Sequence, residues 1–145
     1  MTNETLDDDV AARLRTADQR YTSGRRQLVA VLSGATAPMT IQQILESDRG
    51  LAQSSVYRNL AILEQVGAVT RIVTHDDFAR YELAEDLTEH QHHLICSACG
   101  DVSDFSLADG VERDLETALR KVARRSRFEI EAHRLDLVGV CGDCR

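Results

Sequence analysis

Apolar residues in the first part of the chain recur at intervals of three and four, which is the spacing of amphipathic helices. This pattern predicts helices over residues 10–17, 25–33 and 54–66, together with a short helix that begins after Thr40. Thr40 suits a helix N-terminus because Gln43, three residues later, completes a capping box with it. The first part of the chain is therefore predicted to consist mainly of short helices.

Two runs rich in β-branched and apolar residues follow these helices, at 68–74 and 79–83. The polar stretch His75-Asp76-Asp77 lies between them as a turn, so the pair is predicted to form a β-hairpin. Helices joined by a short break and followed by a hairpin occur in this order in a winged helix-turn-helix. The alternative is an ordinary three-helix domain with a trailing hairpin.

The predicted helix at 54–66 turns its apolar stripe inward and leaves a polar outer face. That face carries a hydroxyl group, an aromatic ring and a guanidinium group, from Ser55, Tyr57 and Arg58. Such side chains contact bases and phosphates, and the small residues beside them let a backbone approach DNA. This face therefore favours the winged-helix interpretation.

The second part of the chain combines predicted strands with one long helix. Residues 93–96 and 102–105 are predicted strands, and residues 109–125 are a predicted amphipathic helix. Residues 128–140 are expected to form a strand in which the apolar alternation changes phase near His133, which suggests a bulge or a strong twist there. The apolar side of the helix consists of Val111, Leu115, Ala118, Leu119 and Val122. Because so small a unit buries little surface alone, we expect it to pair with a second copy of itself.

The chain has 145 residues, a hydrophobic fraction of 43% and a formal net charge of −7. That length allows one good core or two small ones, and the negative charge argues against nucleic-acid binding over the whole surface while leaving room for a local basic patch. No apolar run approaches the length of a membrane span, and the acidic start is unlike a secretion signal. We therefore expect a cytoplasmic protein with no membrane partner, whose thiols face a reducing environment.

Four cysteines form two Cys-x-x-Cys pairs, Cys96 with Cys99 and Cys141 with Cys144. Each pair can span one tight turn and supply two ligands, so together they match a tetrathiolate zinc site. The alternatives are four unrelated thiols, or two disulfides in a secreted protein. The pairwise spacing, with Gly100 directly after the first pair, favours zinc, and the histidines just before Cys96 suggest a second metal site beside it.

Several short motifs occur along the chain in one order. They are Arg20-Tyr21-Thr22, Ser54-Ser55-Val56-Tyr57-Arg58-Asn59-Leu60, Tyr81-Glu82-Leu83, His92-His93-Leu94-Ile95-Cys96 with Cys99-Gly100, and Cys141-Gly142-Asp143-Cys144. In this combination the chain resembles the ferric uptake regulator family of bacterial metal-responsive repressors. With the acidic stretch at 85–89 as a hinge, the resemblance implies an α+β fold. An N-terminal winged helix-turn-helix at 1–84 would be followed by a small αβ dimerisation domain at 90–145. It also implies a homodimer that reads a palindromic operator in double-stranded DNA.

The resemblance further implies two metal sites. The four cysteines match structural zinc ligands, and a second set matches a regulatory site at the domain junction: His90, His92, Glu112 and His133. Three imidazoles and one carboxylate suit tetrahedral Zn²⁺, and they could take Fe²⁺ or Mn²⁺ with added water. We therefore expect a structural Zn²⁺ and a second divalent ion, for which Zn²⁺ is favoured over Fe²⁺ and Mn²⁺.

A further hinge site that many family members have is degraded in this chain. Pro38 stands where its first histidine would be, and Gln91 replaces another. Glu82 and His93 remain, so the site is either missing or rebuilt around these two residues. The other residues that could complete it are Glu89 and His75.

The predicted function is a metal-dependent transcriptional repressor, most plausibly of zinc-uptake type. We expect Tyr57 to contact bases, with Ser55 beside it on the same helix. Arg58 and Arg25 are expected to contact phosphates, and Arg20 to reach into the minor groove. The alternatives are an iron- or manganese-responsive regulator, or a peroxide sensor, on the same scaffold. Because the chain lacks H-E-x-x-H and a Gly-rich phosphate loop, we expect neither a zinc hydrolase nor a small-molecule substrate.

Overall fold

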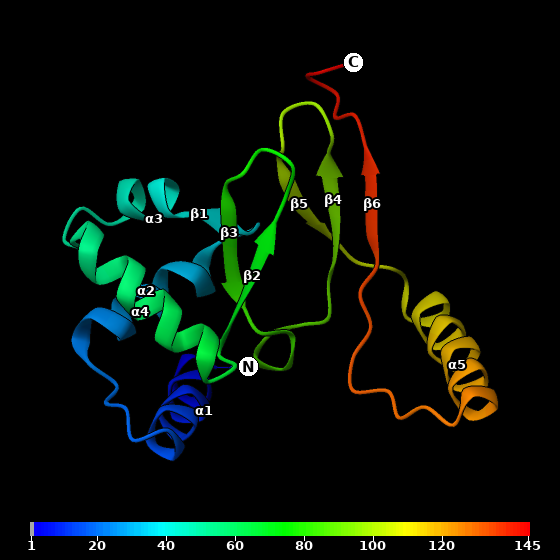
Figure 1. Ribbon diagram of the computed structural model, residues 1–145, viewed down its shortest axis with the longest axis horizontal. Helices are drawn as coiled ribbons and strands as arrows, with labels where there is room; N and C mark the ends of the chain where they lie inside the picture. The colour runs from blue at the N-terminus through cyan, green and yellow to red at the C-terminus, as the bar shows by residue number, and fades with distance from the viewer. Residues whose placement is uncertain (1) are drawn as a thin grey trace.

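The first part of the chain folds into four helices and a small antiparallel sheet (Figure 1). The computed structural model describes residues 2–145. In chain order the elements are α1 (Asn3–Thr16), α2 (Ser23–Gly34), β1 (Met39–Thr40), α3 (Ile41–Ser47), α4 (Gln53–Gln65), β2 (Val69–Val73) and β3 (Ala79–Leu83). The strands pair in the order β1-β3-β2, and β2 with β3 is the predicted hairpin. The winged-helix arrangement predicted for this part of the chain is confirmed.

The helix boundaries follow from identifiable caps. Thr22 accepts a hydrogen bond from the backbone N–H of Arg25 at the start of α2, and Thr40 and Gln43 form both halves of the predicted capping box on α3. The chain leaves α4 through Gly67, whose φ of 75° lies in the left-handed region that glycine adopts without strain. These short-range signals explain why the helices end close to where they are predicted to end.

Two expectations for the first part need correction. The first helix begins at Asn3 rather than near residue 10, because Thr2 caps it and Leu6 extends the buried stripe of Val10 and Leu14 by one turn. Strand β1 is not predicted at all. With two residues it is too short to show an alternating pattern, and it exists because Met39 pairs with Tyr81 on β3.

The second part of the chain forms a separate three-stranded sheet and one long helix. Its elements are the 3₁₀ turn η1 (Glu85–Leu87), β4 (His92–Cys96), β5 (Val102–Phe105), α5 (Asp109–Ser126) and β6 (Asp136–Gly139). Strand β4 is central: β5 pairs with it antiparallel, and β6 pairs with it in parallel. The α+β fold class is thereby confirmed.

The prediction of one strand over residues 128–140 is wrong for most of that range. Only Asp136–Gly139 pairs, because the neighbouring strand β4 begins at His92 and the register sets His93 beside Asp136. Leu135 still accepts a hydrogen bond from the backbone N–H of His93, but the residues before Leu135 run past the end of β4 and have no strand to pair with among the described residues. His133 therefore lies in the connection from α5 to β6, and the phase change near it is no β-bulge.

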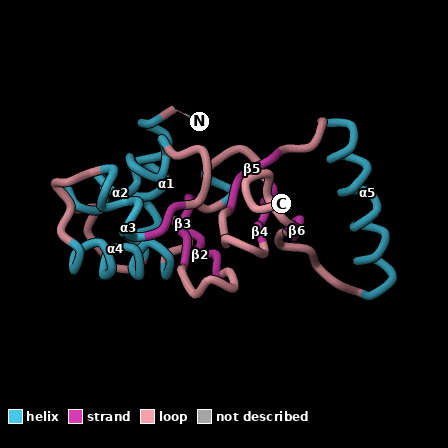
Figure 2. The backbone as a smooth tube through the Cα atoms, turned by 90° about the horizontal axis from the view of Figure 1, so that it is seen from above, coloured by secondary structure: helices cyan, strands magenta, loops and turns pink. Residues whose placement is uncertain are grey.

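Helix α5 stands apart from both sheets (Figures 1 and 2). Its apolar stripe stays largely uncovered, with Val111 53% and Val122 59% exposed. Phe128, Leu137 and Val138 are also at least half exposed. Within residues 2–145, no helix is both long and apolar enough to cross a membrane. One copy of the chain therefore leaves a large part of the apolar surface of its second half open.

The hairpin turn between β2 and β3 lies against the turn that follows β4. Asp76 in the hairpin turn is ion-paired with Arg80 at 2.9 Å, and its carboxylate approaches Gly100. A Cβ added at Gly100 would lie 2.1 Å from Asp76 Oδ2, and the φ of Gly100 is 78°. Position 100 therefore requires glycine for two independent reasons.

Replacing Gly100 with alanine should lower the free energy of unfolding by at least about 1–3 kcal/mol, the usual cost of a left-handed non-glycine residue, with the clash against Asp76 in addition. The measurement is urea unfolding. Gly110→Ala in α5 is the matched control, because a Cβ there meets no atom within 4 Å, and it should be neutral or stabilising by up to about 1 kcal/mol. Equal stabilities for the two variants would contradict the close contact.

Candidate metal centres and nucleic-acid interface

The two Cys-x-x-Cys pairs come together at one end of the second sheet. Cys96 ends β4, and Cys141 lies just beyond the end of the parallel strand β6, so both pairs emerge on the same side. The four sulfur atoms lie within 4.8 Å of one another, and Cys99 Sγ is 3.9 Å from Cys141 Sγ. A tetrahedral Zn²⁺ with Zn–S bonds of about 2.3 Å separates its sulfur atoms by roughly 3.8 Å. No disulfide joins these cysteines within residues 2–145, so the geometry fits a tetrathiolate zinc site.

Hydrogen bonds prepare one of these thiols to be a ligand. Backbone N–H groups of Cys141 and Cys99 point at Cys96 Sγ and lower the pKa of that thiol to about 6. Hydrogen bonding to Cys141 raises the pKa of Cys144 to about 12, because four neighbouring sulfur atoms cannot all be thiolates without a cation. A divalent ion at the centre would remove that repulsion, and its binding would release protons.

A second cluster gathers at the opposite end of β4. His92 begins that strand and His90 lies in the connection just before it, Glu112 lies in the first turn of α5, and His133 lies in the connection before β6. The Glu112 Oε1 atom is 2.9 Å from His90 Nε2 and 3.3 Å from His133 Nε2, and its Oε2 atom is 2.9 Å from His92 Nε2. Three imidazoles therefore turn the same nitrogen toward one carboxylate.

Several atoms of this cluster lack ordinary partners. Among the described residues, His90 Nε2, His133 Nε2 and Glu112 Oε1 are buried and find no hydrogen-bond partner in spite of their short separations. His92 is almost fully buried, at 1% exposure. Its hydrogen bond to Glu112, together with the nearby imidazoles, lowers the pKa of that carboxyl group. Lone pairs that converge on one point without hydrogen-bond geometry are the arrangement that a divalent cation requires.

The third cluster surrounds His93, whose side chain leaves β4 toward the winged helix. His93 Nε2 is 2.9 Å from Glu82 Oε1 and 3.7 Å from Asp104 Oδ1, and Nδ1 is 3.2 Å from Asp136 Oδ1. The Glu82 hydrogen bond raises the pKa of His93, and burial raises the pKa of Asp104 to about 6. A protonated imidazole can hold this group together without any metal.

Two members of the His93 cluster are missed by sequence reasoning. Asp104 and Asp136 are the residues that stand opposite His93 on β5 and on β6. Their positions depend on strand register, so only the paired sheet identifies them. The expected completing residues Glu89 and His75 are both exposed and lie outside the cluster.

Helix α4 carries the residues of the candidate DNA-binding face. Tyr57 is 55% exposed and Arg58 is exposed beside it, whereas Ser55 is partly buried. Arg20 is exposed in the loop between α1 and α2. Arg25 is 8% exposed, and its guanidinium donates to Asn59 Oδ1 and to the Arg20 carbonyl. Arg25 therefore positions the start of α2 against α4, and its expected contact with a phosphate stays a prediction.

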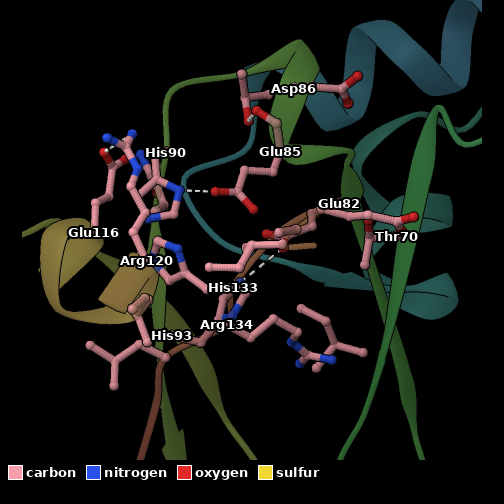
Figure 3. A pocket seen from close by; sticks show the side chains of 18 residues that line it. Thr70, Glu82, Glu85, Asp86, His90, His93, Glu116, Arg120, His133 and Arg134 are labelled. Carbon is pink, nitrogen blue, oxygen red and sulfur yellow. Dashed lines mark hydrogen bonds and ion pairs between the residues drawn. The ribbon is translucent and has the colours of Figure 1, made fainter. Parts of the chain in front are cut away.

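A cleft separates the hairpin from α5 and is bordered by both histidine clusters (Figure 3). Its volume is about 880 Å³. Glu82 and Thr70 line it from the hairpin, His90 and Glu85 from the connection between the two sheets, and Glu116 from α5. Side chains from both halves of the protein thus face one another across this space.

Comparison with known proteins identifies the family to which this chain is related. The profile of the Ferric uptake regulator family matches residues 16–138. The Ferric uptake regulation protein of Campylobacter jejuni is 30% identical over 137 residues, which cover 90% of this chain and 83% of that protein. The Peroxide-responsive repressor PerR of Staphylococcus aureus is 29% identical over 145 residues, which cover 97% of this chain and 91% of that protein.

A solved structure shows the same fold. The structure of the Helicobacter pylori ferric uptake regulator Fur aligns with a TM-score of 0.76 and covers 99% of this chain and 94% of that chain, at 24% identity. One of these relatives is named for ferric uptake and the other for a peroxide response, and they match this chain at almost the same identity. Overall similarity therefore does not identify the signal to which this chain responds. The chain belongs to the ferric uptake regulator family, whose members are metal-responsive transcriptional regulators.

Proposed function

We propose that this protein is a zinc-responsive transcriptional repressor that binds a palindromic DNA operator as a homodimer. The observation that carries the proposal is the convergence of His90, His92 and His133 on the single carboxylate of Glu112. Three neutral nitrogen ligands and one oxygen ligand favour tetrahedral Zn²⁺, whereas Fe²⁺ and Mn²⁺ favour more oxygen ligands and higher coordination. We assign these four residues to the regulatory site and the four cysteines to structural Zn²⁺.

The proposed response follows from where the four ligands lie. They come from the start of β4, the first turn of α5 and the connection before β6, three segments that meet beside the hinge. A bound divalent ion would join these three segments, because each ligand atom would form a coordination bond in place of the repulsion between neighbouring lone pairs. The ligands then favour one placement of the segment at 85–89, and so one spacing of the two winged helices in the dimer. We place the hinge at 85–89, between a DNA-binding domain at 1–84 and a dimerisation domain at 90–145.

The uncovered apolar surface supports the homodimer. Two valines on α5 and three apolar residues in or just after β6 are at least half exposed: Val111, Val122, Leu137, Val138 and Val140. A monomer rarely leaves so many large apolar side chains open, and a second copy would cover them. Two recognition helices related by the dimer axis would then read the two halves of a palindrome in successive major grooves. A protein with this function works in the cytoplasm, where its DNA operator lies.

One observation favours a second candidate function. The group Glu82, His93 and Asp104 offers two carboxylates and one imidazole, and this oxygen-rich set suits Fe²⁺ or Mn²⁺ better than Zn²⁺. An iron- or manganese-responsive regulator, or a peroxide-responsive repressor like the Staphylococcus aureus relative, would use this group as its sensing site. The raised pKa of His93, caused mainly by its hydrogen bond to Glu82, weighs against it, because a proton on the imidazole competes with a metal ion.

The comparison of two histidine variants decides between the sites. His133→Ala should retain the cysteine-bound zinc and the dimer but lose most of the zinc-stimulated operator binding, because it removes one ligand of the regulatory set. His93→Ala should keep the response. The measurement is a zinc titration of operator binding by fluorescence anisotropy. The reverse result, with the response lost in His93→Ala alone, would move the regulatory metal to the His93 cluster.

The recognition face gives a prediction of its own. Tyr57→Ala should weaken specific operator binding by about 1–3 kcal/mol, the usual value of a good base contact. Arg58→Ala should lower the slope of log affinity against log salt by about one, as expected for one lost phosphate contact. Arg125→Ala is the matched control, because Arg125 is exposed on α5 and far from α4. If Arg125→Ala weakened binding as much as Arg58→Ala, the assigned face would be wrong.

The cysteine cluster predicts a loss of fold. Cys96→Ser should release the tightly held zinc and destabilise the second half of the chain or its dimer, because structural zinc binding contributes directly to folding free energy. Zinc content by mass spectrometry and dimer mass by light scattering are the measurements. Ser97→Ala is the control, since Ser97 lies in the same turn but contributes no sulfur. A dimeric Cys96→Ser protein with full zinc content would contradict the assignment.

A further inference from the structure

A carboxylate from the hinge reaches the proposed regulatory site from the winged-helix side. Glu85 on η1 contacts His90 Nδ1, while Nε2 of the same ring lies 2.9 Å from Glu112 Oε1 (Figure 3). The imidazole is thus held at both of its nitrogen atoms. One carboxylate comes from α5 and the other from the turn that leads out of the hairpin.

The turn that carries Glu85 is attached firmly to the winged helix. Leu87 is 2% exposed and belongs to the hydrophobic core formed by the N-terminal helices. Asp86 is ion-paired with Arg13 on α1, and Arg13 also donates to the Gly67 carbonyl at the end of α4. Leu87 and Asp86 therefore hold η1 against the DNA-binding half, so within the proposed hinge Glu85 moves with that half and residues 88–89 are left to bend.

We propose that Glu85 is a positioning residue for the regulatory metal ion and that it links occupancy of the site to the position of the winged helix. This inference rests on the proposed function and deepens it. A carboxylate that accepts the Nδ1–H of His90 selects the tautomer whose Nε2 lone pair faces the other metal ligands. Metal binding at Nε2 in turn polarises Nδ1–H and strengthens its hydrogen bond to Glu85. Each event favours the other.

The neighbouring acids do not share this position. Asp86 points to Arg13, and Glu116, which lines the same cleft, lies 3.5 Å from Arg120. Glu85 is 42% exposed, so its charge acts on the site mainly through the direct contact with His90 and little through long-range attraction. Removal of Glu116 therefore changes the charge of the cleft by the same amount without touching a ligand.

The first test measures zinc affinity at the regulatory site of the full-length protein, by competition with a chromophoric chelator after the cysteine site has been filled. Glu85→Ala should weaken this affinity by about 10- to 100-fold, the usual effect of losing such an outer hydrogen bond. Glu85→Gln should recover part of the loss, because its amide oxygen can still accept from Nδ1–H. Glu116→Ala should bind zinc within about twofold of the parent. Parental affinity in Glu85→Ala, or an equal loss in Glu116→Ala, would overturn the proposal.

The second test measures the link to the winged helix. Hydrogen exchange of residues 84–88 should slow when zinc fills the regulatory site of the parent protein. In Glu85→Ala it should change little, even at zinc concentrations that saturate the weakened site. If zinc protected residues 84–88 of Glu85→Ala as much as those of the parent, Glu85 would not be the residue that links the metal site to the winged helix. Failure of the proposed function appears differently: the parent would then bind zinc at His90 without any change in operator binding.

Discussion

Parallel pairing of β6 with β4 is the contact on which both proposed metal centres depend. The register aligns Gly139 with Cys96, so the cysteines that follow each strand emerge at the same end of the sheet. Because the strands run in the same direction, the segments that precede them also meet, and these carry His90 and His133. A short ladder of backbone hydrogen bonds thus brings seven of the eight candidate ligands to the two ends of one strand, and α5 supplies the eighth, Glu112.

The two histidine clusters differ in the ratio of imidazoles to carboxylates, and this ratio decides their chemistry. Around Glu112, three imidazoles face one carboxylate, and His90 Nε2, His133 Nε2 and Glu112 Oε1 are buried without a hydrogen-bond partner among the described residues, so this donor set fits a divalent cation. Around His93, one imidazole faces three carboxylates, and its own proton supplies the positive charge. The first cluster suits a sensor of metal ions. The second joins the hairpin to the second sheet through the contacts of His93 with Glu82, Asp104 and Asp136.

Coupling between the halves of the protein is concentrated in a few polar contacts across the cleft. Glu82 on β3 reaches His93, Glu85 on η1 reaches His90, and Asp76 in the hairpin turn packs on Gly100. Each contact joins an element of the winged helix to a residue within, or next to, a ligand set. Few apolar contacts cross the same boundary, because the hydrophobic core lies within the N-terminal helices and hairpin. Such a polar boundary can be reorganised at modest free-energy cost, as a switch between two placements requires.

The sequence by itself determined the features that depend on neighbours along the chain. These are the helical periodicity, the capping box of Thr40 and Gln43, the exposed Tyr57 and the paired cysteine turns, all of which depend on residues only a few positions apart. The tertiary structure alone decided the burial of Arg25, the strand limits in 128–140 and the carboxylates around each histidine. Those features depend on strand register and on packing between distant segments, and a one-residue shift in register would change every such partner. For this reason the family motifs along the sequence pointed to the candidate histidines, whereas Asp104 and Asp136 became visible only once the strands of the second sheet had paired.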